Sequence, residues 1–342
     1  MTDLGEKRFL VAGCGSIGRR HLSNLEALGI RDFVLLERDE ARLAEAAEGL
    51  QQRPILAVDL GRALEARPYA AIICLPTSLH LPCAMRLARE GVHLFIEKPL
   101  SHTMAGVAEL AELVSVNGIT AMMAMCYRFH PVIRAIKERL SSGIIGRVYH
   151  VNYFGGFYLP YWQRGVDYRK GYAAREELGG GVLLTSIHGL DNLRWLFGEA
   201  AEVKAFTSRV SSLEIDVEDL ALAVMRLASG AYVSWQTDFL QQADQHRMVI
   251  VGEKGTMRFD IIRGVEEICI GDGGKWQSRE IPFEVSSMYV QEMECFLSAL
   301  ATGAPVMAGL GEGVKTLELA MEVRESALGD SVKEEMKLCL SI

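Results

Sequence analysis

The chain has 342 residues, of which 49% are hydrophobic and 23% are charged, and its formal net charge is −8. This length predicts about two domains, and the negative charge gives no basic field for nucleic acid or for an anionic membrane surface. No run of about 18 apolar residues occurs and the first residues lack a secretory signal, so we expect a cytoplasmic protein with no membrane partner.

Seven cysteines are scattered through apolar segments, with no C-x-x-C pair among them. An odd number without such pairs argues against a disulfide framework and against a structural zinc site. We therefore expect reduced cysteines in the core and no metal site.

A glycine-rich turn follows the first predicted strand, Arg8–Ala12. The run Gly13-Cys14-Gly15-Ser16-Ile17-Gly18 has the G-x-G-x-x-G spacing and leads into a helix predicted to end near Leu28. In this motif the first glycine permits the tight turn, the second lets a pyrophosphate approach the backbone, and the third lets helix and strand pack closely. A turn without a ligand is the alternative. The residues expected to bind a dinucleotide here are Gly13, Gly15, Ser16, Ile17 and Gly18.

Glu37 follows the second predicted strand and lies 19 residues after Gly18. The dinucleotide fingerprint expects an acid about 20 residues on, where its carboxylate holds the adenosine ribose hydroxyls. That carboxylate favours NAD, whereas the adjacent Arg38 would favour the 2′-phosphate of NADP. Because the acid occupies the strand end, we expect NAD as the cofactor, with NADP as the alternative.

Strand and helix patterns alternate over residues 1–125, which predicts a doubly wound parallel sheet, the Rossmann arrangement of a dinucleotide-binding domain. The predicted strands are Arg8–Ala12, Phe33–Leu36, Ala70–Cys74, Val92–Ile96 and Thr120–Ala124. The predicted helices after the first are Glu40–Leu50, Leu79–Glu90 and Met104–Asn117.

Residues 126–342 carry longer alternating runs with turn signals between them, which predicts an α+β domain on an open, mainly antiparallel sheet. The predicted strands are Arg147–Tyr158, Glu202–Val210, Glu218–Leu227, Ala231–Phe239, Arg247–Val251 and Thr256–Ile262. The predicted helices are Val182–Phe197, Val285–Ala301 and Gly311–Ala327.

The tripeptide Glu97-Lys98-Pro99 stands where the apolar run Val92–Ile96 ends. Ligands of open α/β sheets bind beyond the carboxyl ends of the strands, so a lysine at a strand end faces the cofactor crevice. Such a lysine can accept or return a proton when burial and a neighbouring cation disfavour its ammonium form. The alternative is a salt bridge between Lys98 and Glu97 that serves the structure alone.

Further motifs follow one another in a specific order along the chain. They are Gly13–Gly18, Leu75-Pro76-Thr77 with His80, Glu97-Lys98-Pro99, Tyr127-Arg128-Phe129-His130-Pro131, and Gly179-Gly180-Gly181 with His188 and Asp191. In this order they resemble the Gfo/Idh/MocA oxidoreductases, the family of glucose-fructose oxidoreductase and inositol dehydrogenase, over nearly the whole chain. The resemblance implies NAD(P)-dependent hydride transfer on a hydroxyl or keto carbon of a small-molecule sugar, nucleotide-sugar or cyclitol. It also implies a homodimer or homotetramer, with the open sheet of the C-terminal domain used for substrate binding and for oligomer contacts.

The same resemblance places Lys98 beside the nicotinamide and the reacting carbinol, as the principal acid or base and as a contact to both cofactor and substrate. Other cofactor contacts are expected from residues near the strand ends. These are Leu75, Pro76, Thr77, His80, Glu97 and Arg128. An ordinary helix-entry turn is the alternative for Thr77 and its neighbours.

His188 matches the family's active-site histidine, which can act as an acid or base or can hydrogen-bond the substrate hydroxyl. Here the sequence departs from the family pattern. Many members carry an aspartate three or four residues earlier, where this chain has Thr185 and Leu184, and close relatives often have glutamate in place of Gly189. Asp191, one turn later on the same helix face, is predicted to orient His188, while Thr185 and His188 are predicted to contact substrate. A capped or core histidine is the alternative.

The segment 158–172 is dense in aromatic residues and cations. Aromatic faces stack on sugar rings, and arginines grip carboxylate or phosphate groups. The substrate contacts predicted in it are Tyr158, Trp162, Arg164, Arg169 and Tyr172. The segment is similar to loops of family members from surface-polysaccharide pathways, which implies an acidic or nucleotide-linked sugar. A structural loop or an oligomer contact is the alternative.

Two other functions are compatible with these motifs. One is glycoside hydrolysis through transient oxidation with NAD retained, which some family members perform. The other is an NAD-dependent sensor or regulatory protein, because the aspartate before His188 is missing and because a fold does not establish a function.

Overall fold

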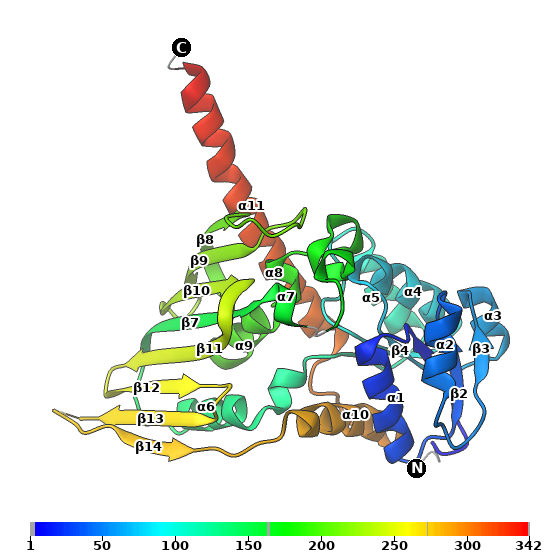
Figure 1. The fold of residues 1–342 in the computed structure, drawn as a ribbon. Coiled ribbons are helices and arrows are strands. Elements are labelled where there is room, and N and C mark those ends of the chain that lie inside the picture. Colours follow the sequence, from blue (N-terminus) through cyan, green and yellow to red (C-terminus); the bar gives the residue numbers. More distant parts are fainter. Residues whose placement is uncertain (1–3, 163–164, 272, 341–342) are drawn as a thin grey trace. The chain divides into compact units, whose positions relative to one another are not determined.

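The computed structural model describes residues 4–162, 165–271 and 273–340, with residues 330–340 described by their backbone only (Figure 1). The chain divides into two compact units. The first unit is Met1–Phe129 with Val285–Leu317, and the second unit is His130–Glu284 with Glu318–Ile342.

The first unit is built on a parallel six-stranded sheet of order β3-β2-β1-β4-β5-β6. Its strands are β1 (Arg8–Ala12), β2 (Asp32–Leu36), β3 (Ile55–Ala57), β4 (Ala70–Ile73), β5 (His93–Ile96) and β6 (Ala121–Met123). In the register, Val11 of β1 lies between Leu35 of β2 and Ile72 of β4. The strand order therefore reverses between β1 and β4, which is the point where open α/β sheets bind ligands beyond the carboxyl ends of their strands.

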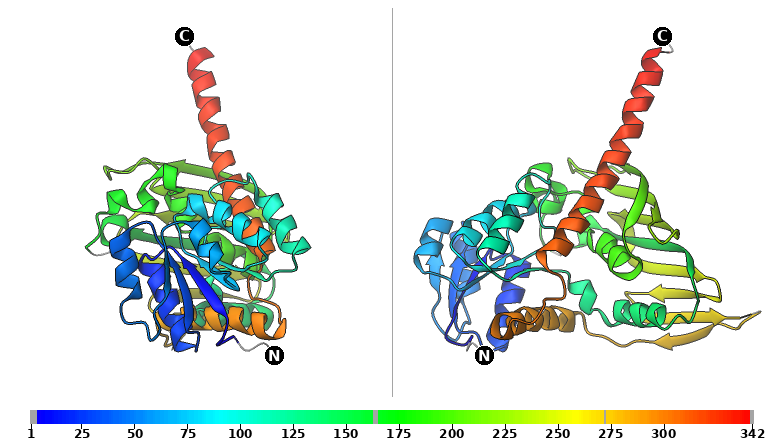
Figure 2. Two further views of the ribbon diagram at one scale, coloured as in Figure 1. Left: turned by 90° about the vertical axis from the view of Figure 1, so that its right-hand side faces the viewer. Right: turned by 180° about the vertical axis from the view of Figure 1, so that it is seen from behind.

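Helices cover this sheet and complete its core. They are α1 (Ser16–Ala27), α2 (Glu40–Ala47), α3 (Leu60–Glu65), α4 (Thr77–Arg89), α5 (Val107–Val116) and α10 (Val285–Thr302), with the 3-10 helix η1 (Cys126–Phe129). Helix α10 packs beside α1, as Figure 2 shows in orange-brown and dark blue. Its Phe296 meets Phe95 of β5 edge to face, with ring centroids 5.5 Å apart. A late segment of the chain thus closes the core of the first unit.

The second unit is built on an eight-stranded sheet of order β14-β13-β12-β11-β7-β10-β9-β8 (Figure 1). Its strands are β7 (Val148–Tyr158), β8 (Ala200–Ser208), β9 (Leu220–Leu227), β10 (Tyr232–Asp238), β11 (Leu240–Gly252), β12 (Gly255–Asp260), β13 (Val265–Ile270) and β14 (Gln277–Glu280). Strands β7 and β10 pair in parallel and every other described pair is antiparallel. The predicted fold class, a Rossmann sheet followed by a mainly antiparallel one, is confirmed.

The helices of the second unit lie around this sheet. They are α6 (Pro131–Ser141), α7 (Leu159–Trp162), α8 (Val182–Thr185), α9 (His188–Phe197), the later part of α11 (Leu310–Leu340), and the 3-10 helices η2 (Tyr168–Lys170), η3 (Tyr172–Ala174) and η4 (Glu176–Leu178). Over the described residues, no helix combines the length and the apolar content that crossing a membrane requires.

The prediction of one continuous helix over Val182–Phe197 is wrong, because the structure has two helices with a break between them. The amides of Ile187 and Gly189 bond the carbonyls three residues earlier, at Leu184 and Ser186, and not four residues earlier. Threonine, serine and glycine near the break have low helix propensity, and bonds to the third residue tighten a helix into a 3-10 turn. His188 consequently begins a helix and does not lie within one.

Candidate active site

Glycines shape the turn between β1 and α1. Gly13 has φ +93°, and a Cβ atom added there would lie 2.5 Å from the carbonyl oxygen of Cys74, while one added at Gly18 would overlap the carbonyl oxygen of Gly13. A Cβ atom at Gly15 would meet nothing within 4 Å. The turn is therefore closed on its inner side and open at Gly15.

The start of α1 fits a phosphate group. Gly15 is the N-cap residue and has no side chain that could occupy the amides of the first turn, and that turn holds no acidic residue. Amides at a helix N-terminus together with the helix dipole favour an anion. The open backbone at Gly15 and the first turn of Ser16, Ile17 and Gly18 thus suit the pyrophosphate of a dinucleotide.

Glu37 lies at the carboxyl end of β2, beside the same turn. Its carboxylate accepts hydrogen bonds from the amide of Cys14 at 3.1 Å, and from the amides of Arg38 and Asp39 at 2.9 and 3.1 Å. The carboxylate is half-buried, whereas Arg38 is exposed. An acid held here suits the two ribose hydroxyls of NAD and repels a 2′-phosphate.

His80 joins the ends of β4 and β5. It is buried in α4, with Nδ1 2.7 Å from the carbonyl oxygen of Pro99 and Nε2 2.6 Å from that of Leu75. Burial lowers the pKa of His80, although the hydrogen bonds to the two carbonyl oxygens act in the opposite direction and favour the protonated ring. Both nitrogens are thus engaged by the backbone of the two strand ends. Pro76 caps α4, and Thr77 is its buried first residue.

Lys98 follows β5 directly and is half-buried. Its amide donates to Oε2 of Glu97 at 3.1 Å, and the Lys98–Pro99 peptide bond is cis. Burial raises the pKa of the Glu97 carboxyl, but the hydrogen bond from His21 and the charges of His21, Lys98 and His80 hold it below its ordinary value. A charged carboxylate therefore stands next to the predicted acid or base.

His21 is a member of this site that the sequence analysis missed. It lies on the buried face of α1 with no exposed surface, and its Nε2 is 2.8 Å from Oε1 of Glu97. The sequence signal was present, because His21 comes three residues after Gly18 and so projects to the same inner side of α1.

Arg128 bonds the start of α11 and the segment before it. Its buried guanidinium donates to the carbonyl of Met307 at 3.1 Å and to the carboxylate of Glu312 at 2.7 Å. These bonds tie η1 to the segment that leads into α11. The predicted contact between Arg128 and the cofactor stays a prediction.

In the second unit, α8 and α9 carry the predicted substrate residues. Thr185 ends α8 and is buried, His188 begins α9 and is half-buried, and Asp191 is fully buried in the first turn of α9. A Cβ atom at Gly189 would lie 2.8 Å from Nε1 of Trp235 and 3.0 Å from Cε1 of Tyr153. Glycine at 189 therefore lets α9 approach the sheet closely, and a glutamate there would not fit.

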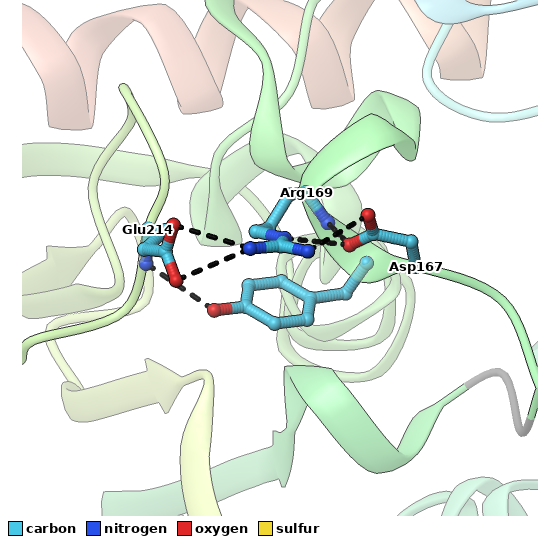
Figure 3. A network of polar contacts seen from close by, with 4 residues as sticks. Asp167, Arg169 and Glu214 are labelled. Atoms are coloured by element: carbon cyan, nitrogen blue, oxygen red, sulfur yellow. Dashed lines mark hydrogen bonds and ion pairs between the residues drawn. The ribbon is translucent and has the colours of Figure 1, made fainter.

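Ion pairs hold the loop before the glycine run. Figure 3 shows Arg169 between two carboxylates, with its Nε 2.8 Å from Asp167 and its Nη1 3.3 Å from Glu214. The hydrogen bonds to Asp167 and Glu214 raise the pKa of the Arg169 guanidinium above its ordinary value, and Arg169 lowers the pKa of Asp167. Tyr168 accepts a hydrogen bond from the amide of Glu214 at 3.3 Å. The positive charge of Arg169 is thus already compensated within the chain.

The predicted aromatic contacts cluster in part. The ring of Trp162 lies 5.1 Å from that of Phe157 and 6.1 Å from that of Tyr172, while Tyr158 meets Tyr161 edge to face at 4.8 Å. Tyr161 and Trp162 expose 64% and 41% of their surface, which leaves aromatic faces available to a ligand. Arg164 lies outside the described residues.

The site residues thus fall into two groups, one in each unit. The first unit brings together the glycine turn, Glu37, His80 and Glu97-Lys98, and the second unit brings Trp162 near Tyr172 and places Thr185, His188 and Asp191 on adjoining helices. A Rossmann sheet with a glycine turn, an acid at the end of its second strand and a strand-end lysine is typical of an NAD-binding oxidoreductase.

Comparison with known families gives the same result. Residues 7–125 match the oxidoreductase family with an NAD-binding Rossmann fold, and residues 133–258 match the GFO/IDH/MocA C-terminal domain. The chain therefore belongs to the Gfo/Idh/MocA oxidoreductase family. The resemblance, the enzyme class and the NAD cofactor predicted from the sequence are confirmed.

Individual relatives cover almost the whole chain. Inositol 2-dehydrogenase of Rhizobium meliloti (strain 1021) is 28% identical over an alignment of 327 positions, which covers 92% of this chain and 94% of the relative. D-apiose dehydrogenase of Paraburkholderia graminis is 27% identical over an alignment of 356 positions, which covers 93% of this chain and 87% of the relative. A levoglucosan dehydrogenase, solved in complex with NADH and levoglucosan, shares the fold with a TM-score of 0.83 at 20% identity, covering 94% of this chain and 97% of that chain.

Proposed function

We propose that the chain oxidises a hydroxyl of a neutral sugar or cyclitol, or reduces the corresponding ketone. Bound NAD supplies the hydride acceptor or donor. In oxidation Lys98 takes the hydroxyl proton as the hydride leaves the same carbon, and in reduction it returns that proton. His188 and Thr185 hydrogen-bond substrate hydroxyls, and Asp191 orients His188.

The position of Lys98 is the observation that carries this proposal. The lysine directly follows β5, one strand away from the reversal in strand order between β1 and β4. Glycine turn, ribose acid and lysine all lie at carboxyl ends of strands of one parallel sheet, the edge where ligands of such sheets bind. A general acid or base at this position typically contributes about 10²- to 10⁴-fold to the rate.

Substitution of Lys98 tests its role. In Lys98→Met we expect kcat to fall by about 10²-fold or more, because no group handles the hydroxyl proton, while the Kd for NAD measured by calorimetry stays within about threefold. Lys7→Met is the matched control, because Lys7 precedes β1 at the opposite end of the same sheet. Normal turnover by Lys98→Met would refute the proposal.

The ion pairs of Arg169 support a neutral substrate. An arginine that recognises an acidic sugar needs its guanidinium available for a bidentate contact, and the guanidinium of Arg169 already bonds Asp167 and Glu214. Relatives named for neutral compounds, inositol and D-apiose, point the same way.

A substrate panel separates the possibilities. Myo-inositol, D-apiose, levoglucosan and an acidic UDP-linked sugar would each be added with NAD, and the absorbance of reduced nicotinamide would be followed. We expect an increase with at least one neutral compound. A response to the UDP-linked acid alone would contradict the neutral class, sugar release without absorbance change would indicate hydrolysis, and NAD binding without any turnover would indicate a sensor.

We also propose that the chain acts in the cytoplasm as a homodimer or homotetramer. The support for self-association is an apolar strip on one face of the second unit's sheet, formed by Phe206 of β8, Val224 of β9 and Tyr232 of β10, which are 53–65% exposed. The strand register places these side chains on the same face. Sedimentation of the wild type and of Val224→Glu tests this proposal, because a charge in a buried interface would favour the monomer.

A further inference from the structure

A buried hydrogen bond connects the dinucleotide-binding helix to the lysine strand. His21 of α1 and Glu97 after β5 are 76 residues apart in sequence, and Nε2 of His21 lies 2.8 Å from Oε1 of Glu97. The side chain of His21 is 0% exposed and that of Glu97 is 11% exposed. A contact this short between buried groups has a strong effect on the position of both.

Packing fixes the imidazole ring so that it can serve only this contact. The ring meets Phe95 and Tyr289 edge to face, with centroids 5.1 and 6.3 Å away. Its Nδ1 is buried and has no hydrogen-bond partner among the described residues. Among the described residues, Glu97 is therefore the one hydrogen-bond partner of the ring, with Nε2–H as the donor.

Glu97 also bonds the backbone of the lysine. While Oε1 accepts from His21, Oε2 accepts from the backbone amide of Lys98 at 3.1 Å. The amide of Glu97 itself donates to the carbonyl of Ile73 in β4 at 3.0 Å. The carboxylate thus bonds both α1 and the Lys98 amide, while the backbone amide of Glu97 bonds β4, so Glu97 fixes the backbone from which Lys98 leaves the strand.

We propose that His21 is a positioning residue, which orients Glu97 and through it holds the Lys98 peptide in the geometry that proton transfer requires. The inference rests on the proposed function, because Lys98 is the acid or base of that function. His21 itself touches neither the lysine amine nor a reacting atom in this scheme. A pair that only stabilised the core would have no specific effect on Lys98.

Two substitutions at the same position separate these roles. His21→Leu removes the donor and keeps an apolar side chain, whereas His21→Gln keeps an N–H donor on a chain of similar reach. We expect kcat to fall by about 10- to 100-fold in His21→Leu, with the KM for NAD within about threefold, and we expect His21→Gln to recover most of that loss. If His21→Leu does not fold, kcat is compared between His21→Gln and Glu97→Gln instead.

The readout that does not depend on activity is hydrogen exchange in the protein without cofactor. We expect the Lys98 amide to exchange at least about tenfold faster in His21→Leu, with the other amides of β5 unchanged, and to return toward wild-type exchange in His21→Gln. His93→Leu is the matched control. His93 lies at the opposite end of β5, where its Nδ1 accepts from the amide of Thr120 at 2.9 Å, so its loss should leave the Lys98 amide and kcat unchanged.

Three results would overturn the inference. They are wild-type kcat in His21→Leu, uniform acceleration of exchange across β5 and α1, and equal losses in His21→Leu and His21→Gln. A wild-type protein without turnover on any substrate would refute the proposed function instead, and the exchange measurement would still decide whether His21 positions Lys98.

Discussion

At the scale of single residues, we predict that Glu37 determines which cofactor the turn accepts. Its carboxylate accepts hydrogen bonds from three backbone amides and lies beside the glycine turn. In Glu37→Ala we expect the Kd for NAD to rise by about 10- to 100-fold, because hydrogen bonds to a charged group are worth about 1.5–3 kcal/mol. The Kd for NADP should rise less, since the carboxylate no longer repels the 2′-phosphate. Titration of the fluorescence of both reduced cofactors measures the two constants.

Asp39→Ala is the control for that substitution. Asp39 is two residues away and caps α2 by accepting from the amides of Ala41 and Arg42. Its loss should destabilise α2 without changing the preference between the two cofactors. If Glu37→Ala keeps the wild-type preference between NAD and NADP, the acid that binds the ribose hydroxyls must be another residue.

Single residues also show what a sequence can reveal about a site. Gly13, Gly15 and Gly18 could be predicted as a cofactor turn because their spacing reflects a backbone constraint that few other residues satisfy. His21 could not be paired with Glu97, because the partner is 76 residues distant and a buried helix histidine carries no local mark of its partner. The ion pair of Arg169 with Glu214 escaped prediction for the same reason, since Glu214 lies 45 residues further on.

At the scale of elements, the glycine at 189 keeps α9 and its histidine close to the sheet. In Gly189→Ala the new methyl group would lie within 3.0 Å of Trp235 and Tyr153, both largely buried. We expect a loss of about 1–3 kcal/mol in the free energy of unfolding, because overpacking outweighs the better helix propensity of alanine. Chemical denaturation measures the loss.

Gly329→Ala is the matched control for Gly189→Ala. Gly329 lies within α11 in the same unit, and a Cβ atom there meets nothing within 4 Å. Alanine should stabilise this helix by about 0.5–1 kcal/mol. Opposite signs at the two glycines are the expected outcome, and a stabilising effect at 189 would show that α9 does not depend on its close approach to β10.

Several of the elements that were not predicted from the sequence lack a clear local pattern. Strand β3 has three residues, too few for a periodic pattern, and helix α3 follows it directly. Strand β14 is exposed at every position, so it lacks the alternation that marks a strand. Helix α6 begins at Pro131 with His130 as its cap, a start signal hidden inside a motif that suggested a site. The division into domains after residue 125 stays a prediction.

At the scale of the whole molecule, buried histidines make the stability depend on pH. Burial lowers the pKa of His246 to about 3 and of His130 to about 4, and it also lowers the pKa of His80 and His93. Tyr153 holds Nε2 of His246 through its hydroxyl at 2.5 Å. The folded protein therefore keeps the rings of His246 and His130 neutral at pH values where the unfolded chain, with histidines near 6.5, binds protons.

The sign of the effect follows from that difference in bound protons. Above about pH 6.5 both states are neutral at these positions and the full stability is present, whereas each histidine loses about 1.4 kcal/mol of stability per pH unit as the pH falls toward the folded pKa. For His246 and His130 together this amounts to about 4 kcal/mol between pH 6.5 and pH 5. We expect Tm to fall by about 6 °C over this range, measured by calorimetry in buffers of constant ionic strength.

Two variants assign the effect to the buried rings. His246→Leu removes one titrating group, so its Tm should fall less steeply between pH 6.5 and pH 5 than that of the wild type, whatever its stability at pH 7.5. His150→Gln changes an exposed position of β7 and should leave the wild-type slope unchanged. If the slope is the same in His246→Leu as in the wild type, protonation of His246 does not contribute to the acid sensitivity, which must then come from other groups, such as carboxylates whose protonation weakens ion pairs at lower pH.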